Sequence, residues 1–182
     1  MPPRRKTAPD TPILSSSHLA AGEWAGLSEM EFGLIVARHA FDRWIVRCMA
    51  AAGIPDLAVT DVLVLHHVHH RERPKKLADI CFTLNYEDAH VVSYALRKLA
   101  GLGLVRSEKV GKEALWSTTK AGRDTVARYR SVRDRCLLGG AADGLGAPSD
   151  PAAARANLAE LAGMLRTLSG LYDQAARAAA SL

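Results

Sequence analysis

Residues 88–122 read DAHVVSYALRKLAGLGLVRSEKVGKEALWSTTKAG, and this stretch changes its hydrophobic period twice. In its first half, apolar residues recur at spacings of three and four, which predicts an amphipathic helix with one buried face. The residues of that face are Ala89, Val92, Leu96 and Leu99. Glycines follow at positions 101 and 103, and glycine is the residue that most often ends a helix. The helix therefore ends near position 101.

Two short runs that favour β-structure come next. They are Leu104–Glu108 and Ala114–Thr118, and Gly111 lies between them. A glycine between two such runs predicts a β-hairpin. Thr119 then has the side chain that suits the N-cap of another helix. The stretch predicts a helix, a hairpin and a second helix in that order.

Two more short helices are expected upstream. Thr60 is the predicted N-cap of the first, DVLVLHHVHHRE, and Pro74 ends it. The second, KKLADICFTL, opens with two lysines, and Asn85 is the predicted N-cap of the helix that follows. Three short helices followed by a hairpin is the order of a winged helix-turn-helix domain.

Long helices are expected on both sides of this core. The first covers residues 28–53, with Ser28 as its N-cap, and the last covers residues 151–182. Both carry apolar residues at helical spacing, so each has a face that needs a packing partner. The remaining segments are a flexible arm at 1–27, a connecting helix at 119–138 and a Gly-rich linker at 139–150.

The positive charge of the chain is concentrated in its middle. Residues 60–136 hold fifteen Lys and Arg against nine Asp and Glu, whereas residues 1–59 hold six of each. A basic segment of this kind is typical of nucleic-acid binding, although ordinary solvated charge gives the same count. The three cysteines share no CxxC spacing and predict reduced, buried thiols. With no apolar run long enough for a signal peptide or a membrane span, we expect a cytoplasmic protein.

The motifs of residues 57–122 resemble those of one family. LAVTDVLVLHHVHH, KKLADICFTL, VVSYALRKLAGLGLV and TTKAG are similar to successive signatures of the MarR family of transcription regulators. The resemblance implies a mostly α fold with a small β-hairpin, in which a winged helix-turn-helix core is flanked by long N- and C-terminal dimerisation helices. The chain departs from the family in its wing, where EKVGKEAL replaces the usual Asp-x-Arg element and Lys112 is the nearest basic substitute.

The resemblance also implies a homodimer that binds double-stranded DNA at a near-palindromic operator, with a small molecule as a possible effector. The two long helices correspond to the dimerisation helices in position and length. The residues expected to pair two chains are Leu34, Phe41, Trp44, Ile45, Leu158, Leu161, Leu165, Leu168 and Tyr172.

The face of the helix opposite Val92, Leu96 and Leu99 is the candidate reading surface. It presents Glu87, His90, Tyr94 and Arg97, with Ser93 beside them and Tyr86 near the helix start. Arginine binds guanine or phosphate, hydroxyl groups donate to phosphate, and a carboxylate accepts from a cytosine amine. The alternative is an ordinary solvated helix face.

Four lysines are candidates for contacts with the DNA backbone, because an ammonium suits phosphate as a point charge. Lys109 and Lys112 lie at the predicted hairpin tip, and Lys75 and Lys76 open the predicted third helix. Each is equally compatible with ordinary surface charge.

The sequence HHVHH is the most conspicuous chemical feature outside the reading surface. His66 and His70 share a helix face at i, i+4, and His66 with His69 makes an i, i+3 pair. Such pairs bind a transition metal when further ligands converge on them. No Cys, Asp or Glu has an obvious ligand spacing here, so we expect no metal and no cofactor, and packing of the histidines at a helix end.

No nucleophile elbow, P-loop, dinucleotide fingerprint or zinc-protease motif occurs, so an enzyme is not expected. The sequence favours a DNA-binding transcription regulator. Two alternatives remain, namely a winged helix that binds protein without reading DNA sequence, and a metal-responsive regulator that uses the histidines.

Overall fold

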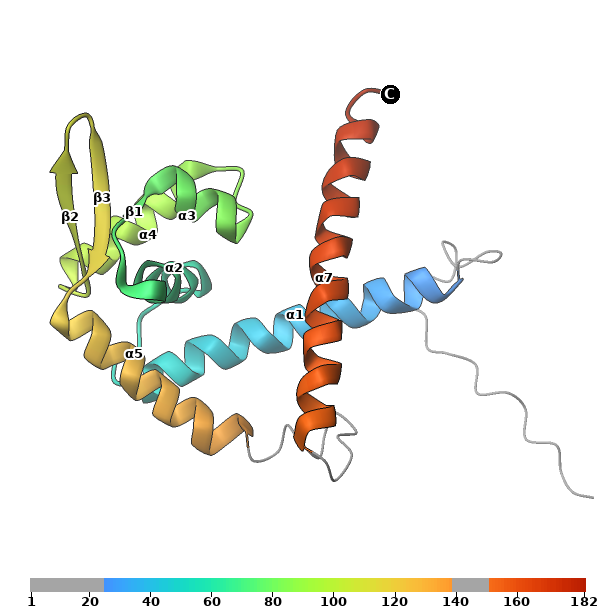
Figure 1. Ribbon diagram of the computed structural model, residues 1–182, viewed down its shortest axis with the longest axis horizontal. Coiled ribbons are helices and arrows are strands. Elements are labelled where there is room, and N and C mark those ends of the chain that lie inside the picture. Colours follow the sequence, from blue (N-terminus) through green and yellow to red (C-terminus); the bar gives the residue numbers. More distant parts are fainter. Residues whose placement is uncertain (1–24, 139–150) are drawn as a thin grey trace, which may run out of the picture. The chain divides into compact units, whose positions relative to one another are not determined.

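The computed structural model describes residues 25–138 and 151–182 (Figure 1). The chain divides into two compact units, Met1–Tyr129 and Arg130–Leu182. The elements, in chain order, are α1 (Ala25–Ala51), α2 (Val59–His69), η1 (His70–Glu72), β1 (Lys75–Lys76), α3 (Leu77–Leu84), α4 (Ala89–Gly101), β2 (Val105–Val110), β3 (Glu113–Thr118), α5 (Lys120–Arg133), η2 (Asp134–Leu138) and α7 (Pro151–Ala179). The predicted fold class, a mostly α chain with a winged helix-turn-helix core, is confirmed.

The core of the first unit lies where α2, α3 and α4 meet. Side chains of all three helices are completely or almost completely buried there: Val62, Val64, Leu65, Val68, Ile80, Val92, Ala95, Leu96 and Leu99. The C-terminal part of α1 adds Ile45, Cys48 and Met49 to the buried set. Burial of so many aliphatic side chains is the main force that holds the three short helices together.

A three-stranded antiparallel sheet, in the order β1-β3-β2, completes the first unit. In it β2 and β3 form the predicted hairpin, which projects from the helices (Figure 1). Gly111 has φ 63° at the two-residue turn with Lys112, as expected for a tight hairpin that begins with glycine. The strands differ slightly from the predicted runs: β2 begins one residue later and continues to Val110, and β3 begins one residue earlier, at Glu113, because Val110 pairs with Glu113.

The lysines Lys75 and Lys76 form β1 and do not begin the third helix, so this part of the prediction is wrong. They pair with Trp116 and Leu115 of β3. The sequence gives little warning of a two-residue strand, because its stability comes entirely from the partner strand.

Three predicted helix starts are also wrong. Ser28 lies inside α1, which already includes residues 25–27 of the predicted arm. Ala58 rather than Thr60 is the N-cap of α2, where its amide donates to the Asp61 carboxylate at 2.8 Å. Asn85 ends α3 in the left-handed conformation, with φ 56°, and Asp88 is the N-cap of α4. The N-cap role of Thr119 is correct, since its hydroxyl accepts from the Gly122 amide at 3.1 Å.

The N-terminal part of α1 carries an apolar surface that is exposed among the described residues of the first unit. Leu34, Ile35, Val36 and Phe41 are all exposed, and Phe41 is 52% exposed. Ile45, in contrast, is 2% exposed and belongs to the core of its own chain. The dimer contact expected of Ile45 stays a prediction, and in the single chain this side chain packs within the core.

The second unit contains the end of α5, the π-helical residues of η2 and the long helix α7. On α7, Leu158, Leu161, Leu165 and Tyr172 are exposed, and Leu168 is half-buried. Cys136 is exposed as well, so the buried role expected of it is wrong. None of the described helices combines the length and the hydropathy that a membrane span requires. Most of the predicted arm (residues 1–24) and the predicted linker lie outside the described residues.

Candidate nucleic-acid interface

The helix α4 is fixed to the core by one face. Its Val92, Leu96 and Leu99 side chains have no exposed surface, and Ala95 has 1%. Ala89, which the sequence places on the same stripe, is exposed, because it stands in the first turn beyond the reach of α2 and α3. At the N-terminus the Asp88 carboxylate accepts a hydrogen bond from the His90 amide at 2.8 Å. The opposite face of α4 must therefore point to solvent.

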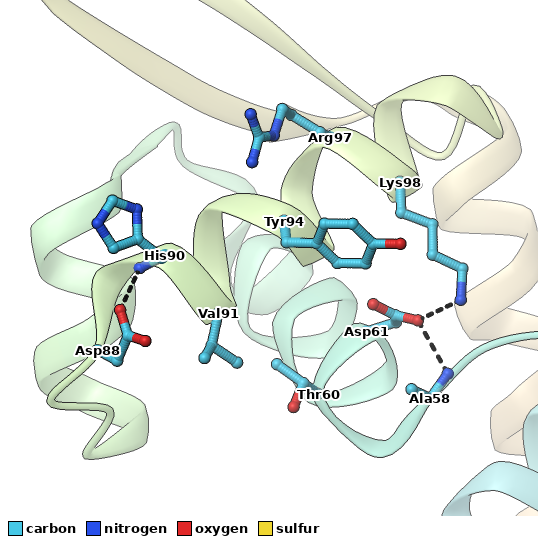
Figure 2. A pocket seen from close by; sticks show the side chains of 9 residues that line it. All are labelled: Ala58, Thr60, Asp61, Asp88, His90, Val91, Tyr94, Arg97 and Lys98. Carbon is cyan, nitrogen blue, oxygen red and sulfur yellow. Dashed lines mark hydrogen bonds and ion pairs between the residues drawn. The ribbon is translucent and has the colours of Figure 1, made fainter.

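The predicted reading residues lie on that outer face. Tyr94 is 66% exposed, and His90 and Arg97 are also exposed on α4. Glu87 is exposed just before the N-cap. Figure 2 shows the Arg97 guanidinium directed away from Asp61, on the outer side of the helix. His90, Tyr94 and Arg97 also line one open pocket on this side of α4, and their contacts with DNA stay a prediction.

Tyr86 and Ser93 are less accessible than the other candidates. Both are half-buried. The Tyr86 hydroxyl is 2.9 Å from the Thr60 hydroxyl, so it connects the loop before α4 to the start of α2. Tyr86 is thus engaged within the domain, and its hydroxyl has only part of its hydrogen-bonding capacity left for DNA.

An open pocket of about 490 Å³ separates the outer face of α4 from the N-terminus of α2 (Figure 2). Its lining consists of Ala58, Thr60, Asp61, Asp88, His90, Val91, Tyr94, Arg97 and Lys98. The sequence indicated His90, Tyr94 and Arg97 of this lining, but it did not indicate Lys98 or the contribution of α2. Val91, which is 40% exposed, was missed as well. The available signal in the sequence was an apolar residue outside the buried stripe of the helix.

The hairpin carries two of the predicted lysines at its end. Lys109 and Lys112 are exposed, one in β2 and the other in the turn. The Lys76 ammonium, in contrast, lies 2.6 Å from the Glu113 carboxylate, and this hydrogen bond raises the pKa of Lys76. Lys76 is exposed but paired, so a contact with phosphate would have to compete with Glu113.

Lys75 is a structural residue. It is 5% exposed, and its ammonium donates to the carbonyl oxygens of Val68, His70 and Arg73 at 3.0, 2.5 and 3.2 Å. Burial, and then the positive charge of Arg73, lower the pKa of Lys75. Its donors are used by the carbonyl oxygen of Val68 in α2 and by those of His70 and Arg73 in the segment that follows, so a contact of Lys75 with phosphate would have to compete with them and stays a prediction.

The histidines of α2 do not converge on a common point. His66 packs edge-on against Tyr129 of α5, with ring centroids 4.4 Å apart. His69 is half-buried at the end of α2, and His70 is exposed in η1. Within the described parts of the chain, no three His, Cys, Asp or Glu side chains are arranged to hold a metal ion. The packing role expected of the cluster is visible at His66.

His67 lies on another side of α2. Burial lowers its pKa, and the charges of Lys75 and His70 lower it further. It borders a second pocket, of about 550 Å³, with His70, Arg71, Arg73, Pro74, Lys75, Asp79, Phe82 and Thr83. This pocket shares no residue with the one beside α4.

Comparisons with known proteins agree with this architecture. Residues 57–122 match the family of winged helix DNA-binding domains. The structure is similar to a MarR transcriptional regulator from Methanosarcina mazei, with a TM-score of 0.63 and 13% sequence identity over 85% of this chain and 98% of that one. A MarR family regulator from Neisseria meningitidis has a TM-score of 0.58 and 16% identity, with 82% and 97% of the two chains covered.

The transcriptional repressor CouR is similar too, in a structure bound to a 23-mer DNA duplex, with a TM-score of 0.58 and 21% identity over 81% of this chain and 98% of that one. No curated protein matches the chain in sequence. The predicted resemblance is therefore confirmed: the chain has the fold of MarR family regulators, with a winged helix DNA-binding domain at residues 57–122.

Proposed function

We propose that this protein is a DNA-binding transcription regulator that binds a near-palindromic operator as a homodimer. The observation that carries the proposal is the orientation of α4. Val92, Leu96 and Leu99 are fully buried, which leaves Tyr94 and Arg97 on the outer face of the helix that follows the turn. In winged helix-turn-helix domains this helix enters the major groove.

Three exposed side chains of the reading surface have a chemical role in the proposal. Arg97 binds guanine or a phosphate, Tyr94 donates to a phosphate, and Glu87 accepts from a cytosine amine. Lys109 and Lys112 at the hairpin end contact the neighbouring phosphates as point charges. Because these contacts include several phosphates, the affinity for DNA decreases as the salt concentration rises.

The homodimer is supported by apolar side chains that are exposed among the described residues of α1 and α7. Leu34 and Phe41 on α1, and Leu158, Leu161 and Leu165 on α7, are each between 37% and 52% exposed. Aliphatic and aromatic side chains repeated at helical spacing and left exposed are typical of an interaction surface. Pairing of two chains through these helices gives two copies of α4, which read two half-sites about one helical turn apart.

The proposal includes a small-molecule effector that binds in the pocket beside α4. The pocket beside α4 has the volume of a small-ligand site, and Tyr94 and Arg97 line it. A ligand in this pocket would cover side chains that the proposed DNA contacts require. Binding of ligand and of DNA would then be mutually exclusive.

Selection of bound duplexes from a random DNA pool tests the proposed function. The full chain is incubated with the pool at two salt concentrations, and the bound DNA is sequenced. We expect an enriched inverted repeat, whose recovery decreases at the higher salt concentration. A pool that shows no enrichment, from a folded and dimeric protein, would favour a winged helix that binds protein and does not read DNA sequence.

A further inference from the structure

Polar contacts attach α4 to the segment that joins α1 to α2 and to the first turn of α2. The Lys98 ammonium, on α4, donates to the Asp56 carbonyl oxygen at 2.6 Å and to the Asp61 carboxylate at 2.7 Å. The same carboxylate oxygen of Asp61 accepts from the Ala58 amide at 2.8 Å. Lys98 thus binds two oxygens that are far from it in the sequence, and Figure 2 shows its ion pair with Asp61 and the bond between Asp61 and Ala58.

This ion pair differs from the other ion pairs of the described residues in its burial. The Asp61 side chain is 4% exposed and the Lys98 side chain 32%, whereas the similarly short pair Lys120–Asp124 is 84% and 50% exposed. An exposed pair contributes little, because water and salt screen it. A buried carboxylate that loses the cation paired with it is strongly unfavourable, so the Lys98–Asp61 geometry is tightly specified.

Lys98 follows Arg97 directly in the chain, and this adjacency connects the ion pair to the reading surface. Successive residues of a helix point about 100° apart, so a fixed direction for Lys98 fixes the directions of Tyr94 and Arg97. Figure 2 shows Lys98 directed toward Asp61 and Arg97 directed away from it. The buried stripe holds α4 to the core, and the ion pair adds a directional constraint, because the Lys98 ammonium reaches two specific oxygens outside α4.

We infer that Lys98 is a positioning residue for DNA reading, which sets the rotation of α4 by holding it to Asp61 and to the Asp56 carbonyl. The inference rests on the proposed function. Lys98 itself does not contact DNA in this account, because its ammonium is committed to the two oxygens. Its loss reduces the discrimination between the operator and unrelated DNA, while the phosphate contacts of other residues persist.

The test compares Lys98→Met with Lys98→Arg and with the control Lys120→Met, which removes the cation of the exposed pair. Affinities for the selected operator and for an unrelated duplex of equal length are measured over a range of salt concentrations. We expect Lys98→Met to lower the ratio of the two affinities by about tenfold, the cost of about one mismatched base pair. Its salt dependence should stay that of the unsubstituted protein. Lys98→Arg should recover part of the ratio, and Lys120→Met should not change it.

Two results would overturn the inference. One is an unchanged affinity ratio in Lys98→Met. The other is an equal weakening on both duplexes with a salt slope lower by about 0.9, which is the signature of one lost phosphate contact.

Amide hydrogen exchange of the folded variants tests positioning without DNA. We expect faster exchange in α4 and around residues 56–61 in Lys98→Met than in Lys120→Met, and equal exchange would also refute the inference. A protein with no preference for any duplex would refute the proposed function, and the exchange measurement would still decide whether Lys98 positions α4.

Discussion

Gly122 of α5 lies directly against the carbonyl oxygen of Leu104, with no room for a side chain between them. A Cβ atom added to Gly122 would overlap that oxygen. The same oxygen accepts hydrogen bonds from the Thr119 amide at 3.0 Å and from the Thr119 hydroxyl at 3.2 Å. The first turn of α5 is therefore anchored to the residue that precedes the hairpin.

Gly122→Ala should destabilise the domain by about 1–3 kcal/mol, because backbone atoms must move to accept the methyl group. Gly101→Ala is the matched control, since Gly101 also lies in a helix and a Cβ there meets no atom within 4 Å. The control should be neutral or slightly stabilising. Urea unfolding followed by circular dichroism measures both variants, and equal midpoints would show that the close approach has no energetic consequence.

Leu96 is one of the fully buried leucines of α4, so its truncation should be costly. It has no exposed surface, so Leu96→Ala removes buried methyl groups and leaves a cavity, at about 2–5 kcal/mol. Leu102, just beyond the end of α4, is 49% exposed, and Leu102→Ala should cost less than about 1 kcal/mol. The free energies of unfolding of the two variants test the orientation of the helix, and a larger loss for Leu102→Ala would contradict it.

Lys75→Met should destabilise the domain without acting through DNA contacts. The substitution keeps much of the aliphatic chain, but it leaves the carbonyl oxygens of Val68, His70 and Arg73 without their donor. Buried groups left unsatisfied cost about 1–3 kcal/mol each, partly relieved here by water. Thermal unfolding measures the loss. A Lys75→Met protein with unchanged stability and weaker DNA binding would identify Lys75 as a phosphate contact after all.

Acidification should weaken the fold through His67. Its pKa lies below the ordinary 6.5, first because of burial and then because of the charges of Lys75 and His70. The unfolded chain therefore takes up a proton before the folded chain does, and stability decreases as the pH falls through 6.5. His67→Gln should reduce this decrease, whereas His39→Gln, at an exposed position of α1, should not. The free energy of unfolding of the unsubstituted protein and of the two variants is measured at pH 7.5 and 5.5. An equal loss of stability in all three proteins would contradict the role of His67.

The sequence was sufficient to predict the elements of the fold that depend on the spacing of apolar residues or on a glycine in a turn. Val92, Leu96 and Leu99 are spaced so that only a helix buries them together, and Gly111 has the conformational freedom that its turn requires. The outer face of α4 followed directly from this stripe. The exposure of Tyr94 and Arg97 could therefore be anticipated, although their contacts with DNA stay a prediction.

Features that depend on tertiary partners could not be predicted from local patterns. Asn85 suits an N-cap by its side chain, but here it closes α3 in the left-handed conformation, which asparagine also tolerates. Lys75 looks like a surface cation in the sequence, and only the arrangement of the end of α2 reveals its carbonyl partners. Lys98 and Asp61 are 37 residues apart, so no local pattern connects them.

The central claim is that the outer face of α4 reads DNA, and the double variant Tyr94→Ala/Arg97→Ala tests it most directly. Its affinity for the selected operator is measured by fluorescence anisotropy, with Lys120→Met as a control for the loss of one positive charge and with sedimentation to follow the dimer. We expect the double variant to remain dimeric and to bind the operator no better than an unrelated duplex, while the control retains its preference. A folded double variant that still prefers the operator as strongly as the unsubstituted protein would contradict the account.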